Sequence, residues 1–102
     1  MNLLKTRKEI EIDFMKACSQ SKELIDISTS LCKIARSDMA ETMVMLRSGW
    51  QGENAGSFYE KAEQLRDELI HNAEDLLKIA DHIHHTADIV YHAEMMAIGV
   101  VS

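Results

Sequence analysis

Apolar residues recur along the first half of the chain at alternating intervals of three and four positions. One row repeats every seven residues and is mostly bulky, and a neighbouring row with the same period is mostly small. The bulky row consists of Cys18, Ile25, Cys32, Met39 and Leu46, and the small row consists of Phe14, Ser21, Ser28, Ala35 and Thr42. This spacing is typical of a helix that packs along a seam. The small row predicts that a partner helix approaches closely.

The second half of the chain shows the same kind of spacing. Its apolar row runs from Phe58 to Val90, with a one-residue phase step between Leu69 and Ala73. Acidic residues occupy the opposite side of the predicted helix, at Glu60, Glu63, Asp67, Glu68, Glu74, Asp75 and Asp81. The pattern therefore predicts a second long helix with one apolar and one charged face.

Between the two patterns lies the only cluster of helix-breaking residues. Three of the four glycines fall between positions 49 and 56, and the chain has no proline. We expect one domain over residues 1–102, with a helix at about 8–48, a turn at about 49–56 and a helix at about 57–97. Gly52 allows the backbone to reverse without the steric penalty of a Cβ atom. The predicted fold is an all-α, antiparallel two-helix hairpin.

Such a hairpin cannot cover the apolar bands of both its helices. The natural completion is a four-helix bundle made from two hairpins, so the pattern predicts a dimer, formed with itself or with a relative. The residues expected in the core or dimer seam are Phe14, Cys18, Ile25, Cys32, Met39, Leu46, Leu65, Leu69, Leu76 and Ile83.

Charge limits the choice of partners. The net charge of −6 disfavours nucleic acid, whose phosphates bind basic surfaces. Residues 1–50 have a net charge of +1 and residues 51–102 a net charge of −7, which favours a more basic, heterologous partner. No apolar run is long enough to insert into a membrane, and no apolar segment near Met1 predicts a cleavable signal peptide.

Candidate chemistry is sparse. His85, Asp88 and His92 share one helix face and form a weak alternative metal site, although a solvated polar face explains the same spacing. Neither a zinc-protease signature, a nucleophile elbow nor a glycine-rich phosphate loop occurs. Cys18 and Cys32 would lie about 21 Å apart along one helix, too far for a disulfide within the chain, which leaves open a bridge between two chains. We therefore expect a non-catalytic protein without a cofactor.

The tripeptide Trp50-Gln51-Gly52 lies near mid-chain between the two predicted helices. In an acidic, all-helical chain of 102 residues, it resembles the WXG superfamily of early-secreted-antigen-like substrates of type VII secretion systems. The resemblance covers the whole chain. It implies that the Trp-x-Gly turn joins two helices and that hairpins pair head to tail into homodimers or heterodimers. It also implies cytoplasmic folding, secretion without a cleavable signal peptide, and a secretion ATPase as partner.

The family further implies a C-terminal export signal, often Tyr-x-x-x-Asp/Glu. This chain departs from that pattern, because Met95 stands at the acidic position after Tyr91. A looser family pattern, in which an acid lies among spaced apolar residues, fits better. The resulting export-signal candidates are Val90, Tyr91, Glu94, Ala97 and Val101. Whether the chain carries its own signal or relies on that of a partner stays open.

Three functional hypotheses follow. The first is a secreted substrate or dimeric export partner of the type VII pathway. The second is a cytoplasmic targeting chaperone for a larger LXG-type toxin, and the third is a metal-binding helical bundle.

We also expect the apolar segment 95–101 to lack a partner within the hairpin, because the first helix is too short to reach it.

Overall fold

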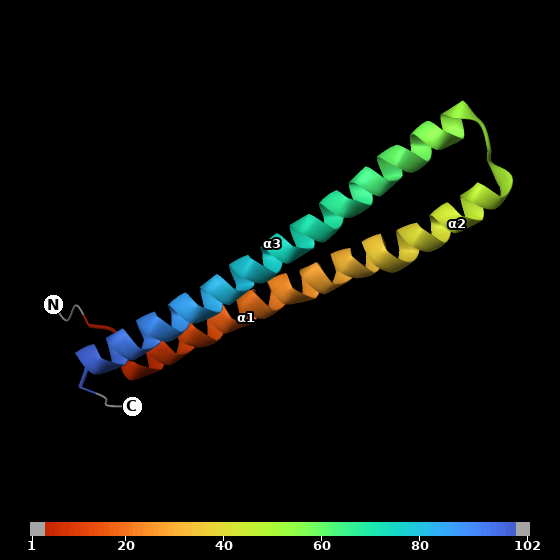
Figure 1. Ribbon diagram of the computed structural model, residues 1–102. Helices are drawn as coiled ribbons and strands as arrows, with labels where there is room; N and C mark the ends of the chain where they lie inside the picture. Colours follow the sequence, from red (N-terminus) through yellow and green to blue (C-terminus); the bar gives the residue numbers. More distant parts are fainter. Residues whose placement is uncertain (1–3, 100–102) are drawn as a thin grey trace. The chain divides into compact units, whose positions relative to one another are not determined.

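The computed structural model describes residues 4–99, and every regular element within that range is helical (Figure 1). Helix α1 spans Arg7–Lys33, a π-helical segment, η1, spans Ile34–Asp38, and helix α2 spans Met39–Gly49. Helix α3 spans Glu53–Ala97. The all-α, helical-hairpin prediction is confirmed for these residues.

The turn between the helical arms is shorter than the sequence indicated. It occupies residues 50–52 instead of about 49–56, because α3 begins at Glu53 and includes Gly56. The backbone N–H of Gly56 donates to the carbonyl of Gly52 at 3.0 Å, which starts the helical hydrogen-bond pattern directly after the turn. A glycine in the first turn of a helix is therefore not sufficient to end it.

The first helix begins at Arg7 because Thr6 caps it. The Thr6 hydroxyl oxygen accepts a hydrogen bond from the backbone N–H of Glu9 at 3.2 Å, which satisfies one of the open donors of the first turn. The sequence carries the signal for this cap, a threonine followed three residues later by a glutamate.

The chain forms two compact units. The first unit comes from Met1–Ile25 and Lys78–Ser102. Within it, the start of α1 and the end of α3 run antiparallel and side by side (Figure 1). The rings of Phe14 and Tyr91 lie 4.8 Å apart, and Met95 is 3% exposed. The expectation that the apolar segment from residue 95 onward lacks a partner is therefore wrong at Met95, which is buried within this unit.

The second unit, Asp26–Leu77, contains the end of α1, η1, α2, the turn and the start of α3. Its two arms are antiparallel, since Ser28 contacts Ala73 near one end and Arg47 pairs with Glu63 near the other. The Arg47 guanidinium lies 3.0 Å from the Glu63 carboxylate and also stacks 5.0 Å above the ring of Tyr59.

Small residues line the interface between the arms in each unit. In the first unit the buried Ser21 hydroxyl donates to the carbonyl of Ala80 at 2.8 Å, and in the second the buried Ser28 hydroxyl donates to the carbonyl of Ala73 at 2.7 Å. A serine reaches the main chain of the opposite helix only where the two backbones come close together. The predicted close approach along the small row is confirmed, and both buried hydroxyls are satisfied.

The π-helical segment η1 shifts the pattern by one residue. The N–H of Met39 donates to the carbonyl of Ile34, five residues back, so this turn holds one residue more than an α-helical turn. Ala35 is buried, but the next buried position is Met43 and not the predicted Thr42. Thr42 is exposed, and its hydroxyl donates to the carbonyl of Asp38 at 2.9 Å.

Candidate functional site

The Trp-x-Gly turn has a backbone that depends on glycine. Trp50 is extended at the end of α2, with φ of −127° and ψ of 115°, and its N–H donates to the carbonyl of Leu46 at 2.8 Å. Gly52 has φ of +119°, a region that side-chain-bearing residues rarely adopt. No heavy atom lies within 4 Å of the place where a Cβ of Gly52 would stand. The glycine is therefore required by backbone conformation and not by crowding.

An aromatic cluster forms on this turn. The ring of Trp50 lies 5.3 Å from that of Phe58 and 6.2 Å from that of Tyr59, and the Tyr59 hydroxyl donates to the carbonyl of Trp50 at 2.9 Å. Tyr59 was not among the residues singled out from the sequence, although an aromatic residue within the first two turns of α3, close to Trp50 in sequence, indicated a contact with the turn. Trp50 is still 40% exposed, so the indole offers part of its surface to solvent.

Beside the cluster, the second unit contains a shallow apolar groove of about 190 Å³. It is lined by residues of η1, α2 and α3: Asp38, Met39, Thr42, Met43, Leu46, Phe58 and Ala62. The shift at η1 places Met43 here, so the π-helical segment shapes both the core and this groove.

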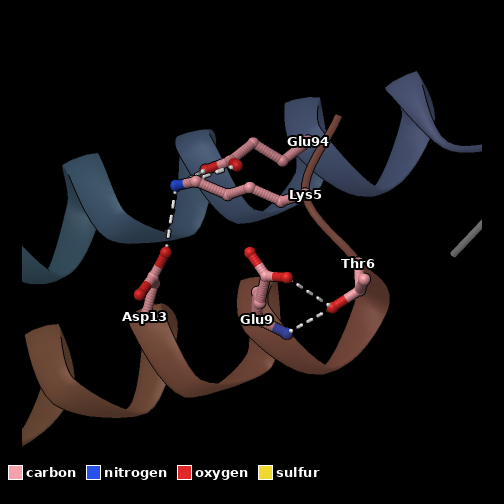
Figure 2. A network of polar contacts seen from close by, with 5 residues as sticks. All are labelled: Lys5, Thr6, Glu9, Asp13 and Glu94. Atoms are coloured by element: carbon pink, nitrogen blue, oxygen red, sulfur yellow. Dashed lines mark hydrogen bonds and ion pairs between the residues drawn. The ribbon is translucent and has the colours of Figure 1, made fainter. Parts of the chain in front are cut away.

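The first unit carries a larger groove of about 350 Å³ between α1 and α3. Lys5, Asp13 and Glu94 are among its lining residues and belong to a network of polar contacts (Figure 2). The Lys5 ammonium lies 2.9 Å from the carboxylate of Asp13 on α1 and 3.2 Å from that of Glu94 on α3. The hydrogen bond to Asp13, and to a smaller extent the one to Glu94, raises the pKa of Lys5 above its ordinary value of 10.5. Lys5 thus joins the two helices from the segment that precedes α1.

The export-signal candidates lie in or near this first unit. Val90 is exposed, Tyr91 is half-buried against Phe14, and Glu94 is ion-paired with Lys5. Ala97 is the last residue of α3, and Val101 lies outside the described residues. The acid and the aromatic ring among these candidates are therefore both in contact with the beginning of the chain.

The predicted seam residues are mostly half-buried in the chain by itself. Ile25 and Leu65 are exposed, at 42% and 50%. The others are half-buried: Phe14, Cys18, Cys32, Met39, Leu46, Leu69, Leu76 and Ile83. Full burial falls instead on small residues such as Ser28 and Ala73, because these lie directly between the two helices.

The histidines do not converge on a metal-binding geometry. His92 Nε2 lies 4.0 Å from the Asp88 carboxylate, and His85 is exposed on the same helix. Across the first unit, His84 Nδ1 lies 3.7 Å from the sulfur of Cys18. Within residues 4–99, no three His, Cys, Asp or Glu side chains gather to hold a metal ion. Both cysteines are free.

Comparison of the chain with protein-family models, with curated proteins and with solved structures gives no match. Among the residues that the structure describes, no helix is both long enough and apolar enough to cross a membrane.

Proposed function

We propose that this chain is a small, non-enzymatic helical-hairpin protein of the type VII secretion pathway, acting as a secreted substrate or as the dimeric export partner of one. The observation that carries the proposal is the Trp50-Gln51-Gly52 turn. It joins the two helical arms, and its glycine has a φ that other residues rarely adopt. The resemblance to the WXG superfamily rests on a Trp-x-Gly turn in this position.

Pairing with a second hairpin is supported by apolar surface that the single chain leaves open. In the second unit the exposed bulky residues include Ile27, Ile34, Val44, Met45, Trp50, Phe58, Leu65 and Leu77. In the first unit they include Ile12, Met15, Ile79, Ile89, Val90 and Met96. Apolar side chains in such number favour burial against another protein. A second hairpin, itself or a related WXG-type protein, would complete a four-helix bundle.

A second candidate, a targeting chaperone for an LXG-type toxin, is supported by the charge of α3. Between Glu53 and Leu77 this helix has seven acidic and two basic residues. Two such surfaces repel each other, so a basic, heterologous partner is favoured over a second copy. In that case the chain stays in the cytoplasm and escorts its partner to the secretion ATPase.

Pairing is tested with two neighbouring substitutions on α3. Leu65→Asp places a charge on the exposed apolar band, while Gln64→Asp adds the same charge beside it at an exposed polar position. An unpaired charge in a covered interface costs several kcal/mol, so Leu65→Asp should dissociate the dimer and Gln64→Asp should not. Sedimentation equilibrium measures both. The pairing proposal would be overturned if the wild-type chain were a stable helical monomer, both alone and when mixed with the proteins encoded by its neighbouring genes.

Export is tested in a host that has a type VII secretion system. Trp50→Ala should lower the amount of chain in the culture medium while the purified variant keeps its helical circular dichroism. Phe58→Ala, which removes another ring of the same cluster, serves as the control for loss of packing. Secretion of Trp50→Ala at the wild-type level, or equal loss of secretion in both variants, would contradict a recognition role for the turn.

A further inference from the structure

The groove in the first unit has an apolar floor that remains open to solvent. Its floor includes Phe14, Ile83, Ala87 and Val90, and its volume is about 350 Å³. Val90 is exposed, and the Phe14 ring is half-buried against Tyr91. A groove between two helices with this lining matches the way in which an apolar helix face is recognised.

The residues that line the groove include two carboxylates, one from each helix. Asp13 belongs to α1 and Glu94 to α3, and the Lys5 ammonium lies between them (Figure 2). Neither helix provides this cation, because Lys5 precedes the Thr6 cap that begins α1. The pair of acids therefore forms a cation-binding cradle, and the chain's own N-terminal segment occupies it.

We propose that this groove is a docking site for an apolar helix of a partner protein that carries one lysine or arginine, whose cation replaces Lys5 between Asp13 and Glu94. The apolar floor receives the aliphatic side chains, and the cradle receives the charged end of the long side chain. Lys5 shows that the cradle accepts an ammonium with both carboxylates in contact. Lys5 is then an internal competitor that the partner must displace.

Charge argues against a second copy of this chain as the occupant. Each copy has a net charge of −6, so two copies repel each other, whereas a basic helix is attracted to the two carboxylates. The inference deepens the proposed function, since it names the partner chemistry of one face. Its test needs neither secretion nor hairpin pairing, so it can fail while both of those hold.

The probes are three synthetic amphipathic peptides of about four helical turns that differ only at one central position, which is Lys, Gln or Glu. Fluorescence anisotropy measures their binding to the purified chain. On the wild-type chain the Lys peptide should bind most tightly and the Glu peptide most weakly. Lys5→Gln removes the competitor and should tighten binding of the Lys peptide by up to about fivefold, the scale of an exposed ion pair.

Three further variants isolate the cradle. Lys8→Gln removes the same charge from an exposed neighbouring position and should leave the affinity for the Lys peptide at the wild-type level. Glu94→Gln should abolish most of the preference for Lys over Gln, and the double variant Asp13→Asn, Glu94→Gln should abolish the rest. Circular dichroism checks that each variant is folded. If the double variant is not, Glu94→Gln alone decides the test.

Three results would overturn the inference. The first is equal binding of the Lys and Gln peptides to both the wild-type chain and Lys5→Gln. The second is the same change in affinity for Lys5→Gln and Lys8→Gln, because this would reflect net charge and not the cradle. The third is self-association of Lys5→Gln in sedimentation where the wild type shows none, because the occupant would then be a second copy.

Discussion

The close approach of the two arms in the second unit depends on Ser28. Its side chain is 1% exposed, and its hydroxyl lies 2.7 Å from the carbonyl oxygen of Ala73, which is itself fully buried. Replacing Ser28 with leucine fills a site that has no spare room, because the opposite backbone lies within hydrogen-bond distance of it. We expect this substitution to push α1 and α3 apart in the second unit.

The size of the effect follows from two contributions. Loss of one buried hydrogen bond costs about 0.5–1.5 kcal/mol. The extra volume of leucine in a packed site costs a further ~1–3 kcal/mol. Ser28→Leu should therefore lower the free energy of unfolding by about 2–4 kcal/mol. Ser28→Ala loses only the hydrogen bond and gains about 0.5 kcal/mol of helix propensity, so it should cost about 1 kcal/mol or less.

Urea unfolding followed by far-ultraviolet circular dichroism measures these differences, at one fixed protein concentration because association also contributes to stability. Ser30→Leu is the matched control. It makes the same change two residues along the same helix, where the side chain is exposed, and should alter the free energy of unfolding by less than about 0.5 kcal/mol. Equal destabilisation by Ser28→Leu and Ser30→Leu would refute the close-packed interface.

Three other predictions use the same unfolding assay. Gly52→Ala should lower the free energy of unfolding by about 1–2 kcal/mol because φ is +119° at this position, whereas Gly56→Ala, inside α3, should leave it unchanged or raise it. A larger loss of stability for Gly56→Ala than for Gly52→Ala would contradict the turn geometry. Met43→Ala should cost about 2–5 kcal/mol because Met43 is buried, and Thr42→Ala, at an exposed position, should cost less; a larger loss for Thr42→Ala than for Met43→Ala would contradict the shift at η1. The hydrogen bond to Asp13, followed by the weaker effect of Glu94, raises the pKa of Lys5. The charged Lys5 side chain therefore stabilises the folded chain fully below pH 10.5, and this stabilisation is lost as pH rises through the raised pKa. The stability difference between wild type and Lys5→Gln should therefore shrink above that pH, and a difference that persists would argue against the ion pairs.

The sequence by itself determined the helical class, the place of the turn and the character of the interface between the arms. Local chemistry decides each of these. The absence of proline and the spacing of apolar residues favour long helices, and Gly52 permits a backbone conformation that few residues tolerate. Ser21 and Ser28, spaced by seven, place small side chains on one helix face whatever the partner is.

Only the tertiary structure decided which residues fill the core after Ala35 and what holds the candidate export residues. Heptad counting assumes an uninterrupted α-helix, and the extra residue in η1 moves the buried position from Thr42 to Met43. Met95 is buried and Glu94 is paired with Lys5 because α1 starts at Arg7 and brings the beginning of the chain beside the end of α3. Contacts between residues 89 positions apart, such as Lys5 with Glu94, depend on the register of the two helices, which no local pattern specifies.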